Sequence, residues 1–122
     1  MIAGIDHVQL AAPPGFEDEA RRFFGGVLGL QEVSNPIDSA GPGVWFQCGP
    51  QQLHVGGEDA FAPARKAHPA FAVDGGERLD ALAARLAASG ATVAWDERPP
   101  GVARFHADDP WGNRLEFRAS GA

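Results

Sequence analysis

The sequence contains a single cysteine, Cys48, in a chain of 122 residues. One thiol cannot form an intrachain disulfide, so a small secreted scaffold held together by disulfides is excluded. The residues around it, Trp45, Phe46 and Gln47, indicate a β-strand. We therefore expect the Cys48 thiol to be a structural group and not a reactive one.

Basic residues are also scarce. Ten Lys and Arg stand against 16 Asp and Glu, which gives a formal net charge of −6 and a pI near 5.0. Binding to a phosphate backbone requires clustered Lys and Arg that release counterions. The composition therefore predicts no nucleic-acid partner.

Long hydrophobic runs are missing as well. No apolar stretch approaches membrane-spanning length, and residues 1–7 lack a basic segment followed by a long apolar one. We expect no membrane partner and a cytoplasmic location. With 44% hydrophobic and 21% charged residues, residues 1–122 have the balance and the length of one folded domain.

What the sequence does contain is an internal repeat. β-prone runs at residues 5–10 and 68–73 each end at a Pro- or Gly-rich turn, and a helical pattern follows each of them. The apolar stripe of the first helix comprises Phe16, Ala20, Phe23, Phe24, Val27 and Leu28, and that of the second comprises Leu79, Leu82, Ala83 and Leu86. Gly29 and Gly90 are the predicted stops.

Three strand-like segments follow each predicted helix. They cover residues 30–33, 44–48 and 52–55 in the first half and residues 92–95, 102–107 and 114–117 in the second. Each half therefore has the order β-α-β-β-β. The sequence predicts an α+β fold of two tandem βαβββ modules, at about residues 4–57 and 68–118, joined by a linker at about 58–67, with a curved mixed sheet that encloses a cleft.

Ligand-type side chains recur at matching places in the repeat. Strand alternation puts His7 and His68 in the first strands, and His54 and Glu116 in the last strands, on the sheet face that points away from the helix. His68 follows His7 by 61 residues and Glu116 follows His54 by 62. When the two modules curve toward each other, these faces line one cleft.

Imidazoles with a carboxylate suit a divalent ion such as Zn, Mn, Fe, Ni or Co. Such an ion would stabilise charge that develops on a substrate oxygen while a nearby base moves a proton. The alternative is that the repeat keeps these residues for hydrogen bonding, or has lost its metal.

Three further residues are candidates for contacting a substrate. Arg104 and His106 lie on the strand face opposite Phe105, where Arg104 would pair with an anionic substrate group. Trp45 would supply a flat wall for a ligand. The alternatives are a solvated arginine, an ordinary polar histidine and an aromatic residue in core packing.

These features resemble the vicinal oxygen chelate superfamily of glyoxalases, bleomycin-resistance proteins and dioxygenases over residues 5–118. The segments that carry the resemblance are residues 5–8 (IDHV), 20–30 (ARRFFGGVLGL) and 109–116 (DPWGNRLE). The second is similar to the family's helix that ends in a Leu-Gly turn, and the third to its turn before a metal-binding strand. The resemblance implies that His7, His68 and Glu116 are metal ligands.

Two departures from the family pattern argue against some of the activities found in the family. Proteins similar to glyoxalase I have a glutamate where this chain has His54, so His54 is a candidate fourth ligand that departs from the family pattern, and one carboxylate of a proton shuttle is missing. The chain also has no tyrosine, which the family's extradiol dioxygenases and fosfomycin-modifying enzymes usually place in the active site.

The sequence predicts a small metal-dependent, glyoxalase-like lyase or isomerase that acts on an oxygen-chelating metabolite or xenobiotic, with Glu116 as the candidate catalytic base. The alternative is a non-catalytic protein of the bleomycin-resistance type that sequesters a small molecule. We expect a homodimer, because many members of the family pair their modules across a dimer.

Overall fold

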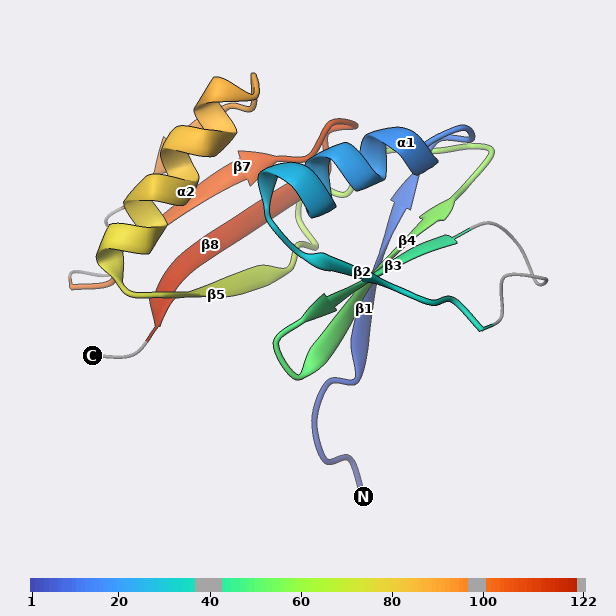
Figure 1. Ribbon diagram of the computed structural model, residues 1–122, viewed down its shortest axis with the longest axis horizontal. Coiled ribbons are helices and arrows are strands. Elements are labelled where there is room, and N and C mark those ends of the chain that lie inside the picture. Colours follow the sequence, from blue (N-terminus) through green and yellow to red (C-terminus); the bar gives the residue numbers. More distant parts are fainter. Residues whose placement is uncertain (37–42, 97–100, 121–122) are drawn as a thin grey trace. The chain divides into compact units, whose positions relative to one another are not determined.

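The computed structural model describes residues 1–36, 43–96 and 101–120. The chain forms two compact units, Met1–Ala62 and Pro63–Ala122, which are described separately below (Figure 1). Both repeat the predicted order of elements, so the prediction of two tandem βαβββ modules is confirmed. Among the described residues, no helix is long and apolar enough to cross a bilayer.

The first unit is a four-stranded mixed sheet covered by one helical segment. Its elements are β1 (His7–Ala12), α1 (Glu17–Ala20), η1 (Arg21–Val27), β2 (Gln31–Val33), β3 (Gly43–Cys48) and β4 (Gln51–Gly57). The strand order is β1-β4-β3-β2, with β1 parallel to β4 and the other pairs antiparallel. Alternate residues of β3 and β4, such as Phe46, Leu53 and Val55, are buried.

The predicted first helix is observed, but its second part is wider than an α-helix. Residues of η1 follow a π-helical course, in which the amide of Leu28 donates to the carbonyl of Phe23 at 2.9 Å. The adjacent Phe23 and Phe24 are both buried in this segment. Gly29, at φ +76°, ends it as predicted, because this left-handed conformation costs a glycine little.

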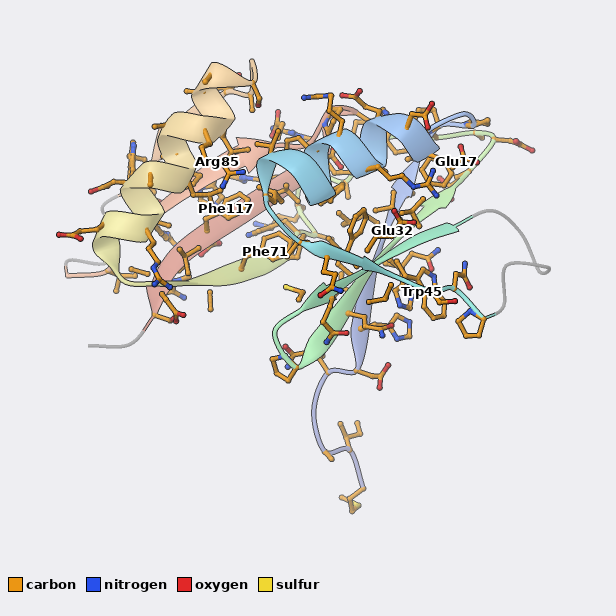
Figure 2. The ribbon with its side chains drawn as sticks, viewed as in Figure 1. Glu17, Glu32, Trp45, Phe71, Arg85 and Phe117 are labelled. Carbon is orange, nitrogen blue, oxygen red and sulfur yellow. The ribbon has the colours of Figure 1, made fainter. Side chains whose placement is uncertain are left out.

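The second unit repeats the plan with β5 (Ala70–Asp74), α2 (Gly76–Ala88), β6 (Val93–Trp95), β7 (Arg104–Asp108) and β8 (Arg114–Ser120). The strand order is β5-β8-β7-β6, with β5 parallel to β8. Helix α2 lies across this sheet (Figure 1). The core includes Leu79 and Leu86 of the helix and the rings of Phe105 and Phe117, and the half-buried Phe71 stacks on Phe117; Phe71 and Phe117 are labelled in Figure 2.

One strand boundary differs from the prediction in a way that affects the site. His68 was predicted inside the first strand of the second module, whereas β5 begins only at Ala70. The sequence His68-Pro69 explains the shift, since proline has no N–H to donate to a strand partner. His68 is therefore positioned by the chain just before the strand.

The turn at residues 109–113 fastens that preceding chain to the sheet. Asp109 accepts hydrogen bonds from the amides of Trp111 and Asn113 and from the Asn113 side chain, at 2.8–3.0 Å. Asn113 Oδ1 in turn accepts from the amide of Ala64 at 2.9 Å, and both turn residues are buried. The turn thus holds the residues that lead to His68 against the start of β8.

We expect Asn113→Ala to lower the free energy of unfolding by about 2–3 kcal/mol, because it leaves buried hydrogen-bonding groups of the turn and of Ala64 without their partner. Urea denaturation followed by circular dichroism measures the change. Asn35→Ala, which removes a weaker 3.3 Å bond to the carbonyl of Gly43, is the control and should cost less. Equal losses in the two variants would contradict the role given to the turn.

Candidate metal centre

A buried carboxylate in the second unit brings together the cluster best suited to a metal. Glu116, on β8, is only 6% exposed. Its Oε1 lies 3.0 Å from His68 Nε2 and 3.4 Å from His106 Nε2. His106 stands directly opposite Glu116 in the β7–β8 pairing, which places both side chains on one face of the sheet. One ligand atom from each of the three residues lies within 4.8 Å of the others.

The orientation of His68 is fixed from behind. Its Nδ1 lies 2.9 Å from the carbonyl oxygen of Lys66, which can only accept a hydrogen bond, so Nδ1 carries a proton. The other nitrogen, Nε2, then points at Glu116 Oε1. A histidine held through Nδ1 by a carbonyl, with Nε2 directed at a carboxylate, has the arrangement that metal-binding histidines require.

The two oxygens of Glu116 face different kinds of partner. Oε1 faces the imidazoles, whereas Oε2 lies 3.4 Å from Arg104 Nη1 and 3.7 Å from Arg118 Nε. Arg104 is itself held by Asp96, whose Oδ2 accepts from Nη2 at 2.8 Å. The guanidinium of Arg104, which Asp96 fixes, therefore limits rotation of the carboxylate and leaves Oε1 directed at His68 and His106.

The charge states of the cluster follow from these contacts. Burial alone raises the pKa of Glu116, but the hydrogen bond with His68 and the positive charge of Arg104 more than offset this, so the pKa lies below its ordinary value. Burial lowers the pKa of His106, and the nearby Arg114 lowers it further. An ionised carboxylate beside a neutral imidazole is the combination that a divalent ion binds.

The distances fit a small transition-metal ion. Ligand atoms at about 2.1 Å from a tetrahedral ion are roughly 3.4 Å apart, and the contacts of Oε1 with His68 and His106 measure 3.0 and 3.4 Å. A divalent ion would bind the same two atoms, His68 Nε2 and Glu116 Oε1.

The first unit contains a repeat-equivalent group that is built differently. His54, on β4, is 5% exposed and is sandwiched between Trp45 at 3.8 Å and His7 at 4.3 Å between ring centroids. Trp45 stands opposite His54 in the β3–β4 pairing, as His106 stands opposite Glu116. The His54 ring also contacts Gln52 Oε1 at 2.9 Å through Nε2. This group is aromatic, and the carboxylate beside it belongs to the exposed Asp6, whose Oδ1 lies 2.9 Å from His7 Nδ1.

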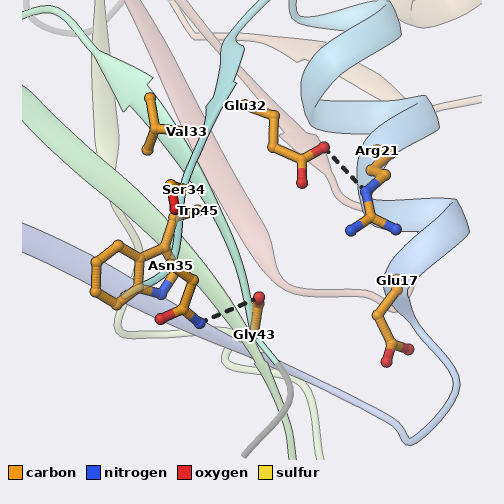
Figure 3. A pocket seen from close by; sticks show the side chains of 8 residues that line it. All are labelled: Glu17, Arg21, Glu32, Val33, Ser34, Asn35, Gly43 and Trp45. Carbon is orange, nitrogen blue, oxygen red and sulfur yellow. Dashed lines mark hydrogen bonds and ion pairs between the residues drawn. The ribbon is translucent and has the colours of Figure 1, made fainter. Parts of the chain in front are cut away.

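Trp45 also lines an open, polar pocket of about 470 Å³ in the first unit (Figure 3). The pocket runs from the start of the helical segment to the end of β2. Two of its lining residues are paired, since Arg21 Nε donates to Glu32 Oε1 at 2.9 Å. Gly43 faces it, and a Cβ at that position would come within 3.2 Å of Asn35 Nδ2. The predicted ligand-contacting tryptophan therefore has both a stacking partner and an open side.

The structure divides the predicted site residues between the two units. His68 and Glu116 meet in the second unit, and His7 and His54 meet in the first.

His106 was predicted to contact substrate, and it also lies within ligand distance of Glu116. Its position 61 residues after Trp45, which matches the spacing of the repeat, was the feature of the sequence that could have indicated this. Arg104, predicted to pair with an anionic group of a substrate, contacts Glu116 and Asp96. Asp96 was missed because a loop carboxylate gives no pattern.

Comparison with known proteins agrees with this architecture. The model of a glyoxalase-like domain family matches residues 14–118. The chain belongs to the glyoxalase-like domain family. This places it in the vicinal oxygen chelate superfamily, as the sequence motifs predicted.

Solved structures of glyoxalase-like proteins share the fold over almost the whole chain. A glyoxalase family protein from Bacillus anthracis is 44% identical, with 99% of this chain and 98% of that chain covered and a TM-score of 0.90. A lactoylglutathione lyase from Agrobacterium tumefaciens is 24% identical over 98% and 95% of the two chains, with a TM-score of 0.77.

A third relative was solved with a metal ion. It is a variant of the fosfomycin resistance protein FosX from Listeria monocytogenes in complex with Mn(II) and 1S,2S-dihydroxypropylphosphonic acid, and it is 19% identical over 99% and 95% of the chains with a TM-score of 0.82. At this identity the likeness establishes the shared fold. No curated protein matches the chain.

The buried His54 ring generates a prediction about pH. Burial, together with the nearby His7, lowers the His54 pKa below its ordinary 6.5, so the unfolded chain binds a proton here more readily than the folded one. Stability contributed by the neutral ring is therefore present above about pH 6.5 and is lost as the pH falls through the lowered value. In His54→Gln this loss should disappear.

We expect the gap in unfolding free energy between the unmodified protein and His54→Gln to shrink as the pH is lowered from about 8 to about 5. Urea denaturation in the presence of a chelator measures the gap without contributions from metal. A gap that stays constant over this range would show that the ring is not held neutral by the fold.

Proposed function

We propose that the protein is a divalent-metal-dependent, glyoxalase-like enzyme of the lyase or isomerase class. The observation that carries the proposal is the His68–Glu116 contact, in which a histidine held through Nδ1 by the Lys66 carbonyl directs Nε2 at a buried carboxylate. With His106, the cluster offers two imidazoles and one carboxylate, which leaves open positions for the oxygens of a substrate.

A divalent ion held here would act as a Lewis acid on a substrate oxygen and stabilise negative charge that develops on it. The chain's own groups prepare the site for this. Arg104 holds Glu116 Oε2, so Oε1 remains available as the ligand atom. Glu116 is also the candidate base, but a carboxylate bound through Oε1 could take a proton only at Oε2, where the two guanidinium groups reduce its basicity.

The participation of His7 and His54 remains a separate part of the proposal. Both have ring nitrogens suited to a metal, and the family resemblance assigns a ligand role to the His7 position. The stack with Trp45 supplies the support that a ligand histidine needs. Substrate contacts by Trp45, Arg104 and His106, a homodimeric state and a cytoplasmic location also remain predictions.

A second candidate function is non-catalytic binding of a small molecule. It is favoured by the contacts that both oxygens of Glu116 make within the chain, Oε1 with His68 and Oε2 with Arg104. A protein that had lost its metal would keep such pairs as hydrogen bonds. Tryptophan fluorescence that a ligand quenches equally with and without chelator would favour this function.

Metal titration tests the proposed centre. We expect isothermal titration calorimetry with Mn²⁺, the ion named for the FosX complex, and then with Zn²⁺, Ni²⁺ and Co²⁺, to show about one site per chain. His68→Ala and Glu116→Ala should each weaken binding on the order of 100-fold, because each removes a ligand atom. His106→Ala should weaken it to a similar degree.

Glu77→Ala is the matched control, since Glu77 is an exposed carboxylate of the same unit outside the cluster and its loss should leave metal affinity unchanged. A parallel titration of His7→Ala tests the contribution of the first unit. The proposal fails if no ion binds at stoichiometric amounts, or if Glu116→Ala binds it as well as the unmodified protein does.

Catalysis is tested by turnover. Formation or breakdown of lactoylglutathione is the first reaction to assay, because a lyase of that name shares the fold. We expect any turnover to disappear with chelator, to return when the bound ion is restored, and to fall at least tenfold in Glu116→Gln. Turnover that survives both chelator and substitution would rule out the cluster as the catalytic site.

A further inference from the structure

The candidate metal centre is surrounded by arginines in a chain whose net charge is −6. Arg104 and Arg118 stand directly opposite each other in the β7–β8 pairing, and both reach Glu116 Oε2. Arg114, two residues before Glu116 on the same strand, is close enough to lower the pKa of His106. This concentration of positive charge at one buried carboxylate is the feature that the metal proposal does not explain.

The balance of charge changes when an ion is bound. In the ion-paired group, the positive charges of Arg104 and Arg118 balance the carboxylates of Glu116 and Asp96. A divalent ion at Oε1 adds two positive charges, so the centre becomes strongly electropositive. In this partly buried setting, an anionic group is the ligand that restores neutrality.

The two paired arginines differ in their freedom to meet such a ligand. The Arg104 side chain is 21% exposed and is tied to Asp96 at 2.8 Å, with its Nε buried and without a hydrogen-bond partner among the described residues. The Arg118 side chain is 44% exposed, and its 3.7 Å contact with Glu116 is its one ion pair within the described part of the chain. Arg104 is thus a positioning residue, whereas Arg118 can turn toward a ligand.

We propose that Arg118 binds the anionic group of the substrate, and that the substrate class is small carboxylates with a second oxygen near the carboxylate. The guanidinium fork pairs with a carboxylate through two parallel hydrogen bonds, while the neighbouring oxygen lies toward Oε1 and the imidazoles. This assignment rests on the proposed metal-dependent function. It makes Arg118 a specificity-determining residue.

The test compares a charged probe with its neutral analogue. Salicylate and salicylamide have the same ring and hydroxyl group, but only salicylate carries a negative charge, and both fluoresce. In Mn²⁺-loaded protein, we expect salicylate to bind at least tenfold more tightly than salicylamide. Arg118→Gln should abolish that preference and leave salicylamide binding unchanged. Arg78→Gln, an exposed arginine of the same unit paired with Asp74, is the matched control and should preserve the preference.

Metal affinity is measured on the same variants by calorimetry. Arg118→Gln should bind Mn²⁺ as tightly as the unmodified protein or more tightly, because it removes a positive charge near the ion. If Mn²⁺ binds but salicylate affinity is unchanged in Arg118→Gln, the anion site is wrong while the metal centre stands.

If Mn²⁺ does not bind, the metal proposal fails independently. The salicylate comparison is then made on the metal-free protein, where binding that Arg118→Gln weakens at least threefold would support the anion site. Equal binding in the two proteins would overturn it.

Discussion

The second unit is organised around one buried negative charge. Removing a carboxylate from water costs several kcal/mol unless partners replace the lost solvation, and Glu116 is only 6% exposed. Imidazoles replace the lost solvation at one of its oxygens, Oε1, and guanidinium groups replace it at the other, Oε2. His68, His106 and Arg104 all contact this one group, and Asp96 holds Arg104 from behind. A metal ion would join an arrangement that is already directed at Oε1.

Periodicity in the sequence was sufficient to predict the fold. Two helical stripes, each preceded by one strand and followed by three, gave the β-α-β-β-β order, and spacings of 61 and 62 residues indicated equivalent positions. The shift of β5 to Ala70 was missed because strand alternation was continued through Pro69. The proximity of His106 to Glu116 was not predicted, because the register between β7 and β8 sets it and the sequence of one strand carries no information about its neighbour.

The two units show how a repeated fold separates roles. In the first unit the position equivalent to Glu116 is His54, and the position equivalent to His106 is Trp45. Flat rings stack there, and the carboxylate that contacts them, Asp6, is exposed to water, so it needs no arginine to replace lost solvation. Cys48 on β3 is also an unreactive group, since burial raises the pKa of its thiol and keeps it protonated. The chemistry that the residues offer is therefore concentrated in the second unit.

The sequence separation of the residues in this centre affects the order in which the centre can assemble. His68 and Glu116 are 48 residues apart in the chain, and helix α2 lies between them in the sequence. They meet only when β8 has paired with β5. Contacts of such long sequence separation form late, because the intervening loop must be closed before they are gained. Binding of an ion would then stabilise only the correctly folded form of this unit, since both ligands come together only when the final strand has its native register.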